Sequence, residues 1–531
     1  MRKLSLPDIP QEDRSPVVNL LLNVVEQQQQ SIGKLASEVS RLKDEIKRLK
    51  NHTKRPKIKP SKMNKNNRAG KDDNSSSKRP GSAKRKKHGS LPIHKTEIVK
   101  AADVPTDAKF KGYDEFIIQD LEIRSMNTKY KLERWRLPNG DYVVGQLADY
   151  LKGNHFGPVI RSFVVYQYHH LCVTQPLLLD QLREWGIAIS SGQLNRLLIE
   201  NKGTFHEEKD ELLRVGLSVS KYVNVDDTGA RHKAKNGYCT HIGNELFAWF
   251  ESTESKSRIN FLQLLRAGWE DYRVDDNALD TMKQQRLPTK PLELLANNKG
   301  ALDDKLSWES YLKTLDITKP RHIKIATEGA LIGSVLSHSF NVDLTIVSDD
   351  AGQFNIFQHA LCWVHAERKI NELIPLSAQH TAAIDGIRNF FWLFYGDLKE
   401  YKESPNKEKK KILSQQFDAL FNTQTCFETL NQVLKRLKHN KSELLLVLDK
   451  PELPLHNNLS ERDIREYVKR RKVSGGTRSD EGRQCRDTFA SLKKTCKKLK
   501  IRFWDYLQDR IRGDNKIPKL SFLIDQAALT Q

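Results

Sequence analysis

Apolar residues follow two different spacings along the chain, and each spacing predicts a different kind of element. Between Val18 and Leu49 they alternate at three and four residues, interrupted only by Gln28, which predicts a parallel two-stranded coiled coil over residues 17–50. An amphipathic helix on the protein's own core is the alternative, although the repeat is long for a surface helix. We therefore expect a homodimer or a higher assembly through residues 17–50.

Residues 1–16 form a tail, and residues 51–105 are predicted to be a disordered basic linker. Asn51–Ser90 holds 14 Lys and Arg against two Asp and has few apolar residues, so this segment cannot fold alone. One interpretation is a flexible arm that binds DNA phosphates and loses affinity as salt rises. The other is a solvated linker without a dedicated role.

Residues 106–215 are predicted to form a small β segment followed by a helical region. Phe116–Ile118 and Tyr142–Val144 have the composition of strands. Further along, Gln175–Trp185 and Ser190–Leu198 have helical patterns with Gly186 between them, which is the layout of a helix-turn-helix.

The second of these helices begins with a capping box formed by Ser190 and Gln193. If this region reads DNA, Gln193, Asn195 and Arg196 are the side chains expected at base edges. A plain helical scaffold is the alternative, because helical hairpins are common without any DNA-binding role.

Strand and helix patterns alternate from residue 216 onward, which predicts an α/β core. Strands are expected near 222–229, 237–243 and 246–252, followed by a helix at 258–266. Residues 269–320 are charged and irregular, so we interpret them as an insertion between the first part of the core (216–268) and the second (321–377). The chain is expected to re-enter the core at 323–326, with a helix near 331–339.

Two of the predicted strands end in a pair of acids. The run Tyr222–Val225 leads into Asp226 and Asp227, and a run of the same build leads into Asp349 and Asp350. Three carboxylates that converge in space can hold two Mg²⁺ ions, because hard divalent ions prefer oxygen ligands.

A third acid, Glu461, begins a helix crowded with cations. Asn458 is a suitable N-cap, and Glu461 lies where a capping acid reaches back to the backbone. Helix capping, or pairing with Arg465 one turn on, is therefore the structural alternative to a functional role.

Five strings in this order resemble the motifs of bacterial insertion-sequence-66 family DDE transposases: VDDTGA, SDDAGQF, HALCWVHAERKI, HNNLSERDIR and RKVSGGTRSDEG. The resemblance spans roughly residues 110–510. It implies a ribonuclease-H-like catalytic core in which Asp226, Asp349 and Glu461 ligate two Mg²⁺ ions, with Mn²⁺ as a substitute. The matched acids directly follow their strands, so Asp226 and Asp349 are preferred to Asp227 and Asp350.

Residues near these acids are expected to support the site. Cys362 and His365, three apart on an expected helix over 359–368, are interpreted as site-supporting; packing with a hydrogen-bonded His is the alternative. His365 is a candidate contact to the scissile phosphate, and Trp363 a candidate stacking platform for a base. Other supporting candidates are Asp227, Asp350, Asn457 and Asn458.

Cations dominate the remainder of the chain. Residues 378–450 are predicted to be a helical insertion, 451–512 the C-terminal part of the core, and 513–531 a tail. Near Glu461, positive charge would offset phosphate repulsion. The candidate DNA-binding cations there are Arg465, Lys469, Arg470, Lys472 and Arg478.

Composition agrees with a nucleic-acid partner. The net charge is +22, which favours a polyanionic ligand without choosing between DNA and RNA. Six scattered cysteines without a C-x-x-C pair indicate neither a disulfide framework nor a Cys₄ zinc site. With no long apolar run or signal peptide, we expect a cytoplasmic, nucleoid-associated bacterial protein without a membrane partner.

The sequence therefore predicts a DNA transposase that binds double-stranded element ends, cleaves them and transfers the 3′-OH strands to target DNA, with element-encoded helper proteins as further candidate partners. Two alternatives remain. One is a ribonuclease-H-like nuclease without strand transfer, and the other is a catalytically inactive coiled-coil DNA-binding regulator.

Overall fold

The computed structural model describes residues 92–338 and 340–530. The predicted coiled coil and residues 51–91 of the basic linker lie outside the described residues. Contacts divide the chain into two units, Met1–Asp120 and Leu121–Gln531. Residues 92–120 contain no helix or strand, so the strand predicted at Phe116–Ile118 is wrong. Among the described helices, none is both long and apolar enough to cross a membrane.

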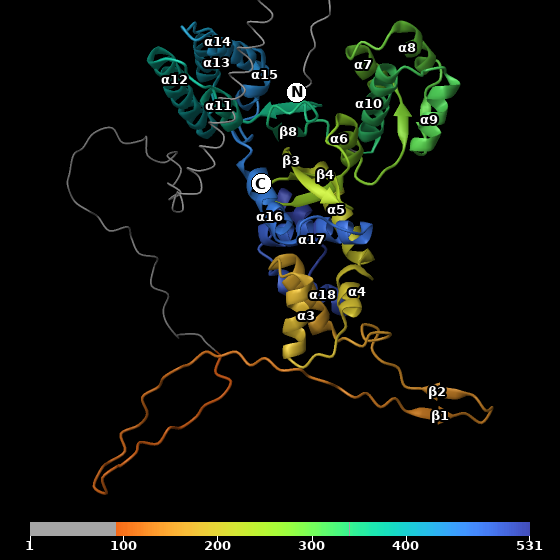
Figure 1. The fold of residues 1–531 in the computed structure, drawn as a ribbon, viewed down its shortest axis with the longest axis vertical. Coiled ribbons are helices and arrows are strands. Elements are labelled where there is room, and N and C mark those ends of the chain that lie inside the picture. The colour runs from red at the N-terminus through yellow and green to blue at the C-terminus, as the bar shows by residue number, and fades with distance from the viewer. Residues whose placement is uncertain (1–91, 339, 531) are drawn as a thin grey trace, which may run out of the picture. The chain divides into compact units, whose positions relative to one another are not determined.

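The second unit is a mixed α/β structure built on a five-stranded sheet (Figure 1). The strand order is β5-β4-β3-β8-β9: β5, β4 and β3 are antiparallel, and β3, β8 and β9 are parallel. The four strands predicted in the core are confirmed as β3, β4, β5 and β8, and β9 is an additional strand. The bounds are β3 Tyr222–His232, β4 Lys235–Gly243, β5 Ala248–Thr253, β8 Thr345–Ser348 and β9 Gln358–Leu361.

Alternation along β3 separates the hydrophobic core from the polar face of the sheet. Val223 and Val225 are fully buried in the main core, which also includes Leu213 of helix α5 (Gly203–Val219). Because successive side chains of a strand point to opposite faces, Asn224 and Asp226 share the other face. That face meets helix α16 (Asn458–Ser474).

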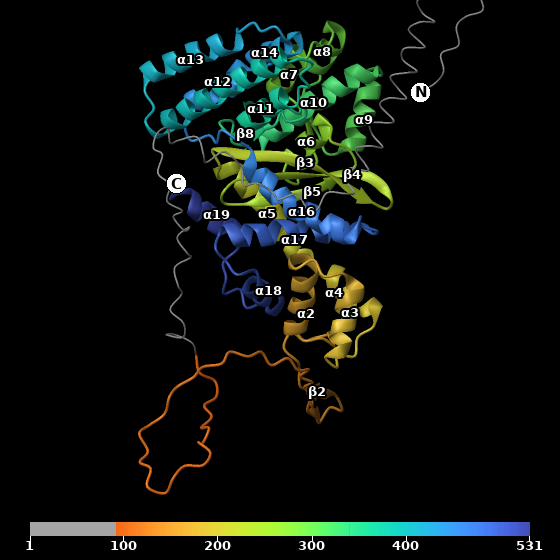
Figure 2. The same cartoon turned by 60° about the vertical axis from the view of Figure 1, so that its left-hand side comes forward.

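Helix α17 (Asp480–Lys498) protects the exposed edge of the sheet. Its Asp487, Ser491 and Thr495 lie at helical spacing and accept hydrogen bonds from the backbone N–H groups of Ser252, Phe250 and Ala248 in β5. These groups would otherwise be left unpaired on the edge strand. Figure 2 shows α17 running along the β5 edge of the sheet.

Before the sheet, the chain forms a small hairpin and a helical region. The strand predicted at Tyr142–Val144 is confirmed as β2, and its partner β1 (Arg134–Arg136) was missed. The two helices of the predicted helix-turn-helix are also confirmed, as is the capping box. The helices are α2 Pro158–Val165, the π-helical turn η3 Tyr166–His170, α3 Gln175–Glu184 and α4 Ser191–Ile199.

Helix α6 (Arg258–Leu265) follows β5, as predicted. The prediction that residues 269–320 are irregular is wrong. The residues that pack this segment together are far apart in sequence. Trp308, for example, stacks on Tyr272, with ring centroids 5.5 Å apart. The expected re-entry at 323–326 lies inside one long helix, α10. The elements are β6 Tyr272–Val274, α7 Asp276–Gln284, α8 Thr289–Ala296, β7 Gly300–Leu302, α9 Lys305–Thr314 and α10 Pro320–Ser337.

Residues 378–450 are helical, as predicted, and they enclose a core of their own around Phe391 and Phe417. Asp350, the second residue after β8, ties this insertion to the sheet by accepting from Arg436 at 2.6 Å. The helices are α11 Trp363–Asn371, α12 Ala378–Glu403, α13 Lys407–Phe421, α14 Glu428–His439 and α15 Lys441–Leu444, followed by the 3-10 turn η4 Leu446–Leu448.

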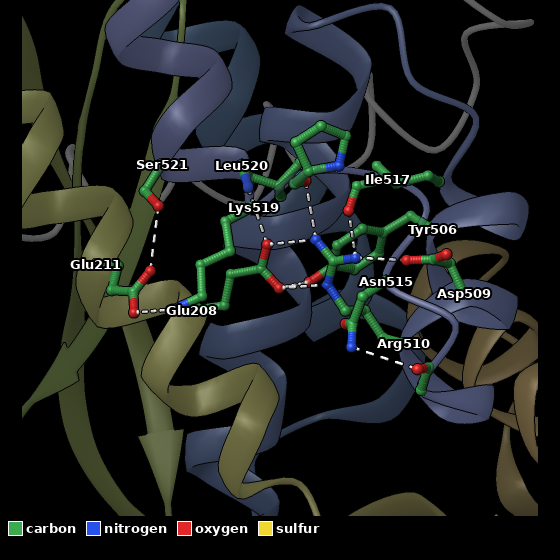
Figure 3. A network of polar contacts seen from close by, with 12 residues as sticks. Glu208, Glu211, Tyr506, Asp509, Arg510, Asn515, Ile517, Lys519, Leu520 and Ser521 are labelled. Carbon is green, nitrogen blue, oxygen red and sulfur yellow. Dashed lines mark hydrogen bonds and ion pairs between the residues drawn. The ribbon is translucent and has the colours of Figure 1, made fainter.

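The C-terminal segment is ordered by a buried carboxylate that sequence analysis missed. Glu208 of α5 accepts from Tyr506 and Arg510 of α18 (Phe503–Arg512) and from the first backbone N–H of α19 (Leu520–Ala528), as Figure 3 shows. Arg510 also donates to the carbonyls of Ile517 and Pro518. The expectation of a tail over residues 513–531 is therefore wrong at Leu520–Ala528, which form a helix that packs on α5.

Replacing Arg510 with Met should strongly destabilise the fold. Both partners are buried, with side chains 9% and 5% exposed in Arg510 and Glu208, so the variant leaves an uncompensated carboxylate. We expect a loss of about 3–5 kcal/mol in the free energy of unfolding, measured by denaturant titration. The matched control is K519M, whose exposed pair with Glu211 should contribute less than about 1 kcal/mol. Equal losses in the two variants would contradict the buried network.

Candidate active site

The site is founded on the parallel pairing of β3 with β8. The pairs are Tyr222 with Thr345, Val223 with Ile346 and Asn224 with Val347. The same register, extended by two residues past the end of the pairing, aligns Asp226 with Asp349, whose charge acts on Asp226. Since paired strands lie about 4.8 Å apart, the two acids are neighbours at the edge where β8 ends.

The two acids repel each other. Burial raises the pKa of Asp226 to about 7, and the negative charges of Asp349, Asp227 and Glu461 add to that rise, against a hydrogen bond from the Asp227 N–H that lowers it. Carboxylates distant in sequence therefore act on one another in space. Such a cluster of partly buried acids favours a bound cation, which would remove the repulsion.

The second acid of each pair is engaged elsewhere. Asp227 accepts from Thr240 at 2.5 Å and from Gln353 at 3.0 Å. Asp350 accepts from Lys369 of α11 and from Arg436 of α14 in the helical insertion. Within the described residues, the only hydrogen bonds to the carboxylates of Asp226 and Asp349 come from nearby backbone N–H groups. This difference supports the preference for Asp226 and Asp349.

Asn457 fastens helix α16 to β3 next to Asp226. It is fully buried, accepts from Asn224 Nδ2 at 2.9 Å and donates to the Val225 carbonyl at 2.7 Å. Its backbone N–H donates to Cys362 Sγ at 3.1 Å. The helix N-cap is Asn457, not Asn458 as predicted, and it makes no side-chain capping bond because its amide is committed to β3.

Glu461, in the first turn of α16, is brought to the acids by this attachment. Its Oε1 lies 3.3 Å from His365 Nε2 and 3.5 Å from Arg368 Nη2, both on α11. Burial, and then the charge of Arg368, lower the pKa of His365. The capping role considered for Glu461 is wrong, since its carboxylate turns to α11, and no pairing with Arg465 is found within the described residues.

A second polar chain holds the same helix from behind. His241, opposite Asp226 in β4, has its Nδ1 2.6 Å from Ser460 Oγ and its Nε2 3.3 Å from Asp463. Asp463 is also paired with Lys498 at 2.8 Å. The sequence motifs did not point to a role for His241, Ser460, Asp463 or Arg368. The only available signal was the proximity of Ser460 and Asp463 to Glu461 along one helix.

The oxygen donors suit a hard divalent ion, although they do not surround one point. Within the described residues, no group of three or more His, Cys, Asp or Glu is arranged around a single cation position. Asp226 and Asp349 are adjacent, while Glu461 is directed to His365 and Arg368. The donor chemistry therefore fits Mg²⁺ or Mn²⁺, with Asp226 and Asp349 the nearest to a shared position.

Two expectations for the motif around residue 362 are wrong. Residues 359–361 belong to β9, and α11 begins at Trp363, so Cys362 is an N-cap residue. Trp363 is only 1% exposed: it packs on Phe391 and donates to the Leu444 carbonyl, so it is not available to stack on a base. Cys362 Sγ accepts from the backbone N–H of Asn457, and its predicted supporting role stays a prediction.

The predicted DNA-binding side chains differ in accessibility. Arg470 is buried, with its guanidinium 3.7 Å from the centroid of the Tyr168 ring, so it joins α16 to η3 instead of facing solvent. Gln193 closes the capping box, and Asn195 accepts from Gln175. The exposed candidates are Arg196, Arg465, Lys469, Lys472 and Arg478, whose role on DNA stays a prediction.

Comparison with known proteins identifies the family. A family model described as "Transposase IS66 family" matches residues 329–485, a span that includes β8, α11, the whole of α16 and the start of α17. The "Uncharacterized protein y4jO" of Sinorhizobium fredii (strain NBRC 101917 / NGR234) is 41% identical over 308 residues, which is 57% of this chain and 96% of that protein.

The chain belongs to the IS66 transposase family. Membership supports a transposase role and implies DNA as the partner. Two of the three acids, Asp349 and Glu461, lie within the span that the IS66 family model matches, while Asp226 precedes it.

The titration of Asp226 predicts a pH-dependent stability. Its folded pKa of about 7 lies above the ordinary 3.8. Between these values the folded protein retains a proton that the unfolded chain has released, so stability falls as pH rises through this range. Without divalent ions, D226N should be more stable than the native protein at pH 8, by up to about 4 kcal/mol, and equally stable at pH 4.

Denaturant titration at both pH values, with D343N as control, tests this expectation. Asp343 is an exposed acid shortly before β8, so its removal should change neither value. If D226N exceeded the native protein in free energy of unfolding by the same amount at both pH values, the raised pKa of Asp226 would be contradicted.

Proposed function

We propose that this protein is a DNA transposase of the DDE type, with Asp226, Asp349 and Glu461 as its metal-binding carboxylates. The observation that carries the proposal is the parallel register of β3 with β8. Extended by two residues, this register aligns Asp226 and Asp349 where β8 ends. The negative charges of Asp349 and Glu461, which help to raise the pKa of Asp226, support the proposal. The strand order, with three antiparallel strands joined to two parallel ones, supports a ribonuclease-H-like core.

The residues of the site would act by holding and orienting. Asp226 and Asp349 present carboxylate oxygens from rigid strand ends, and Asn457 sets the position of Glu461 relative to them. Two bound Mg²⁺ ions would supply activation of an oxygen nucleophile and stabilisation of the leaving oxygen. Hydrolysis of one phosphodiester frees a 3′-OH at each element end, and that hydroxyl then attacks a phosphodiester of the target DNA.

Arg368 and His365 of α11 are proposed to contact the DNA phosphates beside Glu461. Arg368 is 47% exposed and lies against Glu461, where a DNA phosphate would compete for its guanidinium. The pKa of His365 is lowered, which favours its neutral form, a hydrogen-bond partner for a phosphate oxygen or a carboxylic acid. The predicted coiled coil would pair two protomers, so that two element ends share one complex.

A nuclease without strand transfer and an inactive DNA-binding regulator are the competing functions. A strand-transfer assay with pre-nicked element ends separates the transposase from the nuclease. DNA binding without any divalent-ion-dependent cleavage would instead identify a regulator.

Asparagine at Asp349 should abolish cleavage while leaving DNA binding intact. The expected loss is at least about a thousandfold, the rate equivalent of the several kcal/mol that metal-ion stabilisation contributes. D226N and E461Q should behave alike. Cleavage of labelled element-end DNA with Mg²⁺ or Mn²⁺ measures the rate, and D343N should retain full activity. Cleavage by D349N at the native rate would refute the proposed site.

Removing Arg368 should strengthen divalent-ion binding in the absence of DNA. In R368Q the carboxylate of Glu461 loses a competing cation, so the Mn²⁺ affinity should rise by up to about fivefold, as expected for an exposed ion pair. Calorimetric Mn²⁺ titration measures the change. R388Q is the matched control, because Arg388 pairs with Glu367. Equal affinities in R368Q and the native protein would contradict a role for Arg368 at Glu461.

A further inference from the structure

The β1–β2 hairpin is a well-defined element with no packed face. Backbone hydrogen bonds extend its pairing on both sides, from Gly145 N to Glu133 O and from Leu137 N to Asp141 O, each 2.8 Å. The turn uses Gly140 at φ +89°, a backbone conformation that suits glycine. Every residue of both strands is exposed (Figure 1 shows the paired arrows).

The two faces of this ribbon carry different chemistry. Directly paired residues project to the same side of a sheet, so Arg134, Arg136, Tyr142 and Val144 share one face. The Arg134 guanidinium lies 4.1 Å from the centroid of the Tyr142 ring, which keeps the cation flat against the ribbon. Trp135 and Val143 form the opposite face.

The arginine face contains cations without acids. Glu133 accepts from Trp135 Nε1 on the opposite face, and Asp141 in the turn accepts from Asn139. Within the described residues, no ion pair joins either arginine to a carboxylate. An isolated two-stranded hairpin is only marginally stable in water, so a binding partner would stabilise this ribbon. Because its arginines have no carboxylate partners in the described part of the chain, that partner is expected to be anionic.

We propose that the β1–β2 ribbon binds duplex DNA through its arginine face, with Arg134 and Arg136 contacting phosphates or guanine edges. The major groove is wide enough to admit a two-stranded ribbon, and the guanidinium fork matches both targets. This inference rests on the proposed DNA transposase function and adds a second contact to DNA, carried by an element outside the core sheet.

The main rival occupant is a second copy of this chain, docked on Trp135 and Val143. These two side chains are 65% and 53% exposed. The rival predicts that the apolar face controls oligomeric state and that the arginine face is dispensable. The DNA proposal predicts the reverse dependence for binding of DNA.

The test compares full-length variants by fluorescence anisotropy on labelled duplex DNA, in EDTA so that cleavage cannot occur. R134Q/R136Q should raise Kd about tenfold and lower the salt-dependence slope by about two, one for each lost phosphate contact. K305Q/K313Q is the matched control, because it removes two exposed cations of α9. An R134Q/R136Q variant that binds as the control does would overturn the proposal.

The variant W135S/V143S tests the rival interpretation, in which a second copy of the chain docks on the apolar face. Reduced molecular mass by light scattering in this variant, together with unchanged DNA affinity in R134Q/R136Q, would assign the ribbon to protein contact and overturn the DNA proposal. D349N keeps the two hypotheses distinct, because it should abolish cleavage without changing anisotropy. Loss of DNA affinity only in R134Q/R136Q therefore reports on the ribbon and not on the acids.

Discussion

The parallel register between β3 and β8 is the constraint on which the rest of the site depends. Asp226 and Asp349 are far apart in the chain, and only strand pairing brings them together. A shift of one residue would turn one acid to the opposite face of the sheet, because side chains alternate along a strand. Burial of Val223 and Val225 on the core side opposes such a shift, so hydrophobic packing and acid placement are coupled.

Helix α16 is positioned by polar contacts instead of by an apolar stripe alone. The Asn457 amide satisfies Asn224 and the Val225 carbonyl, while His241 and Asp463 hold the same helix a turn further on. Buried polar networks of this kind specify one arrangement, since any displacement leaves unpaired groups away from water. Glu461 is thereby held where its charge acts on Asp226, while its own carboxylate faces His365 and Arg368.

The main elements of the sheet were predictable because their signals are local. β-branched runs ending in acids marked β3 and β8, and the capping box marked α4. Other elements carried no such signal. Residues 269–320 fold around the stacking of Tyr272 on Trp308, and α19 is ordered by Glu208, more than three hundred positions earlier. Trp363 resembled a nucleic-acid contact until its burial in the helical insertion was known.

By itself, the sequence determined four strands of the sheet, many of the helices and the basic character, and it predicted three candidate acids, since composition and periodicity are properties of neighbouring residues. The tertiary structure decided which acid of each pair is bonded to other side chains. Thr240 and Gln353 donate to Asp227, and Lys369 and Arg436 donate to Asp350. It also decided that Arg470 is buried, and that Arg368 faces Glu461. These are contacts between distant segments, and distance in space is not encoded in local spacing.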